Sequence, residues 1–259
     1  MSSSPTSSEW WRPVPLVIAH RGAARDAPEN TLAAFRLAAE MGADAVELDA
    51  RLSADGAVVV HHDLTLDRTT NGAGSVSERS LAELKALDAG GKFDPRFAGE
   101  QIPILDEVFG AVGRRLLINI ELKNYESVFD RLAETVVRIV CRHGLERRVL
   151  LSSFNPFALR TARRLAPEVP RALLVWVGQK GWMQAALRRL TVFEAYHPQD
   201  SMTDRVTIAD QHTQGRRVNV WTVNEVERMR ELLLLGCDGL ITDVPDVARQ
   251  AVRDVADAG

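Results

Sequence analysis

Short runs of apolar residues recur along the chain and alternate with longer stretches in which apolar residues return every three or four positions. The short runs predict buried strands, and the longer stretches predict amphipathic helices. Strands that alternate with helices are typical of a parallel α/β fold. The strand-like runs are Leu16–His20, Ala45–Arg51, Ala57–His62, Arg115–Lys123, Arg148–Ser153, Arg171–Trp176, Phe193–Pro198, Val218–Val223 and Gly239–Asp243.

One of these nine runs does not fit a parallel sheet. Ala57–His62 follows the second run after only Leu52–Gly56, which contains an Asp55-Gly56 turn. A parallel crossover needs about a dozen residues or more, so we expect Ala57–His62 to return antiparallel as the arm of a hairpin. The eight remaining strands predict one (β/α)8 TIM barrel, formed by residues 14–259.

A long segment, Asp63–Arg114, separates the hairpin arm from the third barrel strand. It contains a glycine-rich turn after Asn71, a short helix-like run at Leu81–Leu87, and apolar residues such as Phe93 and Phe97. Long loops on barrels often carry function. We therefore expect a small inserted subdomain between the second and third barrel strands, placed above the active face.

Composition supports one soluble domain with a sizeable core. The chain is 46% hydrophobic and 26% charged with a net charge of −3, which excludes a disordered chain and does not suggest nucleic-acid binding. No apolar run approaches the ~20 residues of a membrane span, so no stable membrane insertion is expected. Residues 1–13 lack the features of a signal peptide, and the expected location is cytoplasmic.

Two small features near the edges of this picture allow several interpretations. Residues 1–13 are expected to be an N-terminal tail, in which Trp10 and Trp11 pack against the barrel bottom, are disordered, or touch a membrane surface. Cys141 and Cys237 are far apart in the sequence and are expected to be reduced, buried thiols.

Side-chain alternation along two strands predicts a cluster of acids. In Ala45–Arg51 the side chains of Glu47 and Asp49 share one face, and in the next barrel strand Glu121 and Lys123 share the inner face. Three inward carboxylates are costly unless they are compensated, and a hard divalent cation with oxygen ligands compensates them. Ion pairing is the alternative, but Lys123 alone cannot neutralise three acids.

Two histidines end neighbouring segments at the same face of the predicted barrel. His20 ends the first strand and His62 ends the hairpin arm. Two imidazoles near one metal suit general acid and base catalysis at neutral pH. His61 points to the opposite face of its strand and is expected to be structural. Arg21 offers a planar fork for phosphate oxygens.

Other polar residues allow both structural and functional readings. Asn30 or Thr31 is expected to cap the first helix, and Glu29 is placed to hold Arg21 or a histidine. Near the C-terminus, Trp221 points inward, either as an apolar wall for a polyol or as a core aromatic. Asp243 ends the last strand and is expected to cap the helix that follows.

Several of these motifs, in this order, resemble those of glycerophosphodiester phosphodiesterases over about residues 16–250. The motifs are His20-Arg21-Gly22, Pro28-Glu29-Asn30-Thr31, Glu47-Leu48-Asp49, His62-Asp63, Asp67-Arg68-Thr69-Thr70-Asn71-Gly72, Ile102-Pro103-Ile104-Leu105-Asp106-Glu107-Val108, Glu121-Leu122-Lys123, Ser153-Phe154, Trp221-Thr222-Val223-Asn224 and Thr242-Asp243 followed by Pro245.

The resemblance implies a function as well as a fold. Enzymes of this family hydrolyse glycerophosphodiesters, which are small molecules, to glycerol 3-phosphate and an alcohol. By position, the resemblance implies that Mg2+ or Ca2+ binds to Glu47, Asp49 and Glu121, that His20 and His62 are the catalytic pair, and that Arg21 and Lys123 contact phosphate. Gly91-Lys92-Phe93 departs from the more aromatic family version, which leaves specificity there open.

Rival functions differ in what they require of the same barrel. A phospholipase-type phosphodiesterase acting on lysophospholipids or phosphoinositides would favour an apolar lip on the inserted segment, where no long apolar run occurs. A non-catalytic barrel that binds metal and phosphate would not need both His20 and His62. A metal-dependent lyase or isomerase on this fold would not need two histidines beside a phosphate.

Overall fold

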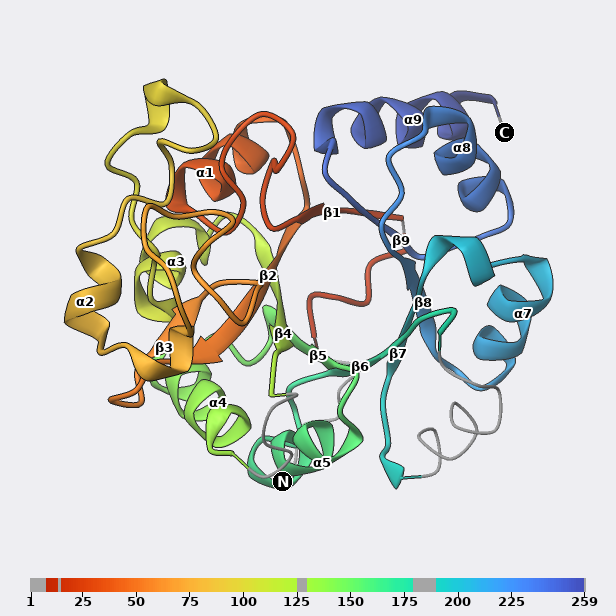
Figure 1. The fold of residues 1–259 in the computed structure, drawn as a ribbon. Helices are drawn as coiled ribbons and strands as arrows, with labels where there is room; N and C mark the ends of the chain where they lie inside the picture. The colour runs from red at the N-terminus through yellow and green to blue at the C-terminus, as the bar shows by residue number, and fades with distance from the viewer. Residues whose placement is uncertain (1–7, 14, 125–129, 179–189, 259) are drawn as a thin grey trace.

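A computed structural model describes residues 8–13, 15–124, 130–178 and 190–258, so residues 1–7 of the expected tail lie outside the described part. Parallel strands close into a barrel that surrounds the centre of the molecule (Figure 1). Going around it, each strand pairs with the next, and β1 pairs with both β9 and β2. The TIM barrel is thereby confirmed. The barrel strands are β1 (Leu16–His20), β2 (Ala45–Leu52), β4 (Leu117–Leu122), β5 (Val149–Ser153), β6 (Arg171–Val175), β7 (Ala195–Pro198), β8 (Arg217–Val220) and β9 (Gly239–Thr242).

Amphipathic helices form a ring outside the barrel, and the core lies between the two layers (Figure 1). The expected cap of the first helix is Thr31, whose hydroxyl accepts from the backbone N–H of Ala34. None of the described helices is long and apolar enough to cross a membrane. The helices are α1 (Leu32–Glu40), α3 (Leu105–Val112), α4 (Leu132–His143), α5 (Pro156–Leu165), α7 (Arg205–Thr213), α8 (Val226–Leu234) and α9 (Pro245–Ala258).

The predicted hairpin arm is present as β3 (Val58–Val60), which pairs antiparallel with the end of β2. It is shorter than expected and ends before the two histidines. The backbone N–H of His61 still donates to the carbonyl of Asp49, so the chain stays beside β2 for one more residue. This contact brings His62 to the end of the barrel at which the parallel strands finish.

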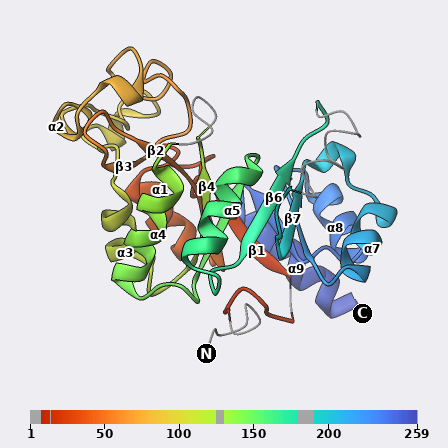
Figure 2. The same cartoon turned by 90° about the horizontal axis from the view of Figure 1, so that it is seen from below.

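The inserted segment follows β3 and contains a short helix, α2 (Leu81–Lys85), and two 3-10 turns, Val76–Glu78 and Pro95–Phe97. Its apolar residues pack with β3 in a small core, formed by Val59, Leu66, Val76, Leu84, Ala89 and Ile102. It stands at the end of the barrel opposite the N-terminal segment (Figure 2), beside β2 and β3 and not across the barrel centre (Figure 1). Helix α3, which the expected range Asp63–Arg114 includes, packs in the main core.

The described part of the N-terminal segment lies under the barrel (Figure 2). Trp10 is 1% exposed and packs on inward residues at the lower ends of the strands, including Leu16 and Leu117. Its indole N–H donates to the carbonyl of Arg148 at 3.0 Å. Of the placements considered for Trp10, packing against the barrel bottom is therefore the one observed.

The two thiols differ from expectation in one respect. Both cysteines are free, and Cys237 is buried, with burial raising the pKa of its thiol to about 12. Cys141 is exposed, so the expectation of a buried thiol at this position was wrong. Apolar periodicity in α4 marks the helix correctly, but Cys141 falls on the side of α4 that faces solvent.

A polar layer crosses the barrel interior below its upper end. His197 on β7 is fully buried, and the side-chain amide of Asn219 on β8 donates to its Nε2 atom at 2.9 Å. Burial lowers the pKa of His197 to about 3. This imidazole is therefore neutral in the folded protein at neutral pH.

Candidate active site

Three buried carboxylates meet where β2 and β4 finish. Glu47 and Asp49 come from β2 and Glu121 from β4, and the strand register sets Asp49 directly opposite Glu121. One oxygen of each carboxylate lies within 4.8 Å of the others. Their exposed fractions are 4%, 1% and 9%, respectively. The inward placement expected from strand alternation is thus observed for all three.

The charges in this cluster are only partly balanced. Lys123 Nζ lies 3.4 Å from Asp49 Oδ1 and 3.2 Å from Glu121 Oε1, while Arg21 Nε lies 3.3 Å from Asp49 Oδ2. The expectation that Lys123 is the lone counter-charge was incomplete, because Arg21 also reaches the cluster. Both cations pair with Asp49. Glu47 accepts a hydrogen bond from the backbone N–H of Arg21 at 3.1 Å.

The pKa directions follow from this geometry. Burial, reinforced by the charges of Asp49 and Glu121, raises the pKa of Glu47 well above its ordinary value. Burial acts the same way on Asp49, but Lys123 and Arg21 outweigh it and lower the pKa of that carboxyl. Ionising all three acids therefore needs more positive charge than the two side chains supply. A divalent cation held by Glu47, Asp49 and Glu121 fits this deficit and the oxygen-only donor set.

The backbone at the end of β1 is shaped for this contact. Arg21 adopts a positive φ of 54°, and its backbone N–H donates to Glu47. Gly22 follows with φ of 87°, and a Cβ atom there would lie 2.7 Å from the backbone of Ala34. Only glycine fits this turn without displacing α1.

Each histidine of the site is held by a carboxylate through the same ring atom. His20 Nδ1 lies 2.7 Å from Asp243 Oδ1, and His62 Nδ1 lies 2.7 Å from Asp63 Oδ1. The pKa of Asp63 is about 2, because hydrogen bonds from Arg68 and His62 outweigh burial. A carboxylate only accepts, so Nδ1 of each ring carries a proton and Nε2 is left for the site.

The two adjacent histidines of the hairpin arm have different surroundings. Burial, together with Lys123 and Arg21, lowers the pKa of His62 despite the opposing effect of Asp49. His61 is buried on the other side of the chain, and its Nε2 lies 3.0 Å from the carbonyl oxygen of Thr65. The two adjacent rings thus have different partners: a backbone carbonyl for His61 and the carboxylate of Asp63 for His62.

A cavity of about 160 Å³ brings the predicted site residues together. Trp221 forms part of its wall, meets Phe154 edge to face at 5.7 Å between ring centroids, and donates its indole N–H to the carbonyl of His197 at 2.8 Å. Trp221 thus lines the cavity and also packs against its neighbours in the barrel, and its contact with a polyol stays a prediction. The lining includes His20, Arg21, Glu47, His62, Glu121 and Lys123.

Several site residues were missed or misread from the sequence. Asp243 was expected to cap the helix that follows it. Its carboxylate instead accepts from His20 and from the side-chain amide of Asn224, at 2.7 Å in both cases. Asn30 was considered only as a cap, yet its side-chain amide donates to Asp49 Oδ2 at 2.8 Å. The role of Asp63 as the partner of His62 was also missed, and its position next to His62 in the sequence was the one signal that could have indicated it.

Behind the cavity, one arginine of the inserted segment links two acids. Glu29 accepts from Arg21 at 3.0 Å, which is one of the two contacts expected for it. Arg68 donates through both terminal nitrogens to the two oxygens of Glu29, at 2.7 Å each, and through Nε to Asp63 at 2.5 Å. Position alone does not reveal the role of Arg68, because one of its partners, Glu29, lies 39 residues earlier in the chain.

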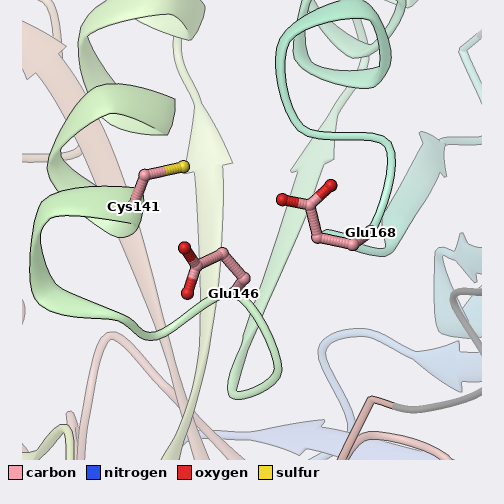
Figure 3. A group of neighbouring side chains, drawn as sticks. All are labelled: Cys141, Glu146 and Glu168. Atoms are coloured by element: carbon pink, nitrogen blue, oxygen red, sulfur yellow. The ribbon is translucent and has the colours of Figure 1, made fainter. Parts of the chain in front are cut away.

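A second group with potential metal-binding atoms lies where the chain leads into β5 and β6 (Figure 3). Cys141 on α4 faces Glu146 in the next loop and Glu168 before β6. Burial and the two glutamates raise the pKa of the Cys141 thiol, whereas metal binding needs the thiolate. This group therefore gives no support to a second metal centre.

Comparisons with known proteins agree with the geometry. The model of the glycerophosphoryl diester phosphodiesterase family matches residues 20–247. A glycerophosphodiester phosphodiesterase of Caldanaerobacter subterraneus is 42% identical over 241 residues, which cover 92% of this chain and 98% of that protein.

Solved structures show the same likeness. A phosphodiesterase of Oleispira antarctica, in complex with the product sn-glycerol 3-phosphate, is 35% identical with a TM-score of 0.87, covering 97% of this chain and 100% of the other. A glycerophosphodiester phosphodiesterase of Agrobacterium tumefaciens is 32% identical with a TM-score of 0.77, covering 92% of this chain and 100% of the other.

Proposed function

Because the chain belongs to the glycerophosphoryl diester phosphodiesterase family, we propose that it hydrolyses glycerophosphodiesters to glycerol 3-phosphate and an alcohol with a divalent metal ion and two histidines. The enzyme class, a phosphoric diester hydrolase, follows from the family. The observation that carries the finer proposal is the buried triad of Glu47, Asp49 and Glu121, of which Glu47 and Glu121 line one cavity with His20 and His62.

The carboxylate triad would hold Mg2+ or Ca2+. When bound, such an ion polarises a phosphoryl oxygen and lowers the pKa of a hydroxyl near it. Arg21 and Lys123 lie against the same carboxylates and present guanidinium and ammonium groups to the cavity. We assign them to the phosphate oxygens, where fixed positive charge stabilises the additional negative charge of the transition state.

The histidines are assigned to proton transfer. With its Nδ1 proton directed at a carboxylate, each ring offers Nε2 to the substrate, and the carboxylate also stabilises the ring when it becomes protonated. One histidine removes a proton from the nucleophile and the other protonates the leaving alcohol. The nucleophile that we propose is the adjacent glycerol hydroxyl, which attacks phosphorus in line; water then opens the cyclic phosphate.

The wall opposite the charged groups suits the glycerol part of the substrate. Trp221 presents an indole ring whose N–H is already bonded to a backbone carbonyl, so the ring face offers apolar contact. The expected result of Trp221→Ala is a higher KM for glycerophosphodiesters.

The deciding experiment is a hydrolysis assay on a panel of glycerophosphodiesters with Mg2+, Ca2+ or Mn2+. Chelator should abolish glycerol 3-phosphate release, and an added divalent ion should restore it. Glu47→Gln, Asp49→Asn and Glu121→Gln should each weaken metal binding in calorimetry. Full activity in excess chelator contradicts the metal role. Faster turnover of lysophospholipids than of any glycerophosphodiester would instead favour the phospholipase-type function.

A further inference from the structure

We propose that Arg68, from the inserted segment, is a positioning residue that keeps Arg21 and His62 in register with each other. The inference rests on the proposed function of the site that it supports. The guanidinium of Arg68 lies between two carboxylates, and each carboxylate contacts one side chain that lines the cavity. Glu29 holds Arg21, and Asp63 holds His62.

All nitrogens of this guanidinium are used. Both terminal nitrogens pair with the two oxygens of Glu29 at 2.7 Å, and Nε pairs with Asp63 Oδ2 at 2.5 Å. A planar fork can satisfy two carboxylates in this way, whereas a lysine ammonium offers neither the plane nor the paired donors. The arrangement therefore calls for arginine and not only for positive charge.

The two acids need this cation for an electrostatic reason. Glu29 and Asp63 reach one guanidinium from different segments, so without it two ionised carboxylates would remain near each other. Repulsion would then move one or both, and the ring of His62 and the guanidinium of Arg21 would lose fixed partners. Each acid also contacts one side chain of the site. Glu29 contacts Arg21, which reaches Asp49, and Asp63 contacts His62, which lines the cavity.

Arg68 is half exposed, which distinguishes it from the buried residues that stabilise the fold. Its side chain is 50% exposed, so removing it uncovers little apolar surface and should leave the melting temperature nearly unchanged. Arg79 provides a matched control. It is an arginine of the same segment, 47% exposed, and pairs with Glu83 away from the cavity.

The kinetic test compares Arg68→Ala, Arg68→Lys, Asp63→Asn and the double variant Arg68→Ala/Asp63→Asn with Arg79→Ala, at saturating metal. We expect Arg68→Ala to lower kcat/KM by about 10- to 100-fold, the usual effect of losing a partner of a site residue, and Arg68→Lys to recover only part of it. In the Asp63→Asn background the further loss should be smaller, because Arg68 acts through Asp63. Arg79→Ala should behave as wild type.

A spectroscopic measurement tests the inference without hydrolysis. Long-range proton–nitrogen NMR of the His62 ring should show the Nδ1–H tautomer in the wild type and a mixture of tautomers in Arg68→Ala. The inference is overturned if the His62 signals of Arg68→Ala match wild type, or if its kcat/KM stays within about twofold of Arg79→Ala. A wild-type protein that cleaves no glycerophosphodiester contradicts the proposed function instead, and the NMR comparison still decides the role of Arg68.

Discussion

At the scale of single residues, the two imidazoles differ from the neighbouring His61 in what holds them. His20 and His62 are each fixed at Nδ1 by a carboxylate, while His61 contacts a backbone carbonyl. We expect His20→Ala and His62→Ala to lower kcat by roughly 10²–10⁴-fold, the range for one acid–base group. Metal affinity, measured by calorimetry, should stay near the wild-type value.

The control for this prediction keeps a polar group at the buried position. His61→Gln retains a donor for the carbonyl of Thr65, so it should leave kcat within a fewfold of wild type. If His61→Gln were as inactive as His62→Ala while remaining folded, the assignment of roles to the two adjacent histidines would be reversed.

A second prediction at this scale concerns Phe93, which is 43% exposed on the inserted segment. It lines a hollow of about 260 Å³ together with Glu29, Arg68 and Lys92, and Glu29 in turn contacts Arg21 of the candidate active site. We expect Phe93→Ala to change the relative kcat/KM among substrates with different alcohol groups by about 10-fold, the scale of a lost apolar contact. Turnover of the smallest substrate should change little.

Competition between pairs of glycerophosphodiesters measures this preference directly. An unchanged order of preference in a folded Phe93→Ala protein would show that this side chain does not select the alcohol. The departure of Gly91-Lys92-Phe93 from the family pattern makes this the position at which specificity should differ.

Residue patterns predicted where the carboxylates of the triad lie, but not which residues hold the other side chains of the site. Strand alternation is strict, so Glu47, Asp49 and Glu121 could be placed on one face before any contact was known. Asp243 and Arg68 lie beyond regular strands, and their direction depends on contacts across the fold. A sequence read one segment at a time does not contain those contacts.

At the scale of elements, the N-terminal segment acts as part of the fold. Trp10 fills the lower end of the barrel, which in this fold usually serves stability. Trp10→Ala should lower the free energy of unfolding by about 3–5 kcal/mol, because it empties a large buried volume. Trp10→Phe keeps most of that volume and loses the bond to the carbonyl of Arg148, at a cost of about 1 kcal/mol.

Urea unfolding of the two variants measures the difference. An equal loss of unfolding free energy in Trp10→Ala and in Val206→Ala, at a position that is 73% exposed, would show that Trp10 contributes nothing to stability.

The sequence left more than one placement open for the N-terminal segment. A short stretch without periodicity gives no strand or helix signal, and the aromatic pair alone allows more than one partner.

The inserted segment was expected from its length, and the expected range Asp63–Arg114 includes α3. A connection of this size is unusual in a compact domain, so an insertion was a sound inference. Helix α3 has the same apolar spacing as any other barrel helix, but it follows the inserted segment without a long break. Packing against α1 and α4, which the sequence does not display, assigns it to the barrel.

At the scale of the whole molecule, stability should depend on pH through His197. Burial lowers its pKa from 6.5 to about 3, so below pH 6.5 the unfolded chain takes up a proton that the folded chain does not. The free energy of unfolding should therefore fall by about 1.4 kcal/mol per pH unit as the pH decreases from about 6 towards 3, in addition to the effects of the carboxylates.

Unfolding by urea at several pH values between 4 and 7, in wild type and His197→Gln, isolates this contribution. The variant keeps a neutral hydrogen-bonding side chain and should show the shallower dependence over that range. Parallel slopes for the two proteins would contradict a neutral, buried His197.

The contact between His20 and Asp243 joins the first strand of the barrel to the residue that follows its last strand. During synthesis the carboxylate triad, both histidines, Arg21 and Lys123 leave the ribosome long before β9. A nascent chain thus carries the three acids of the triad early, yet its His20 lacks the carboxylate of Asp243 until β9 arrives beside β1. Chains that terminate prematurely should therefore be inactive, and the onset of activity should mark the moment at which the barrel closes.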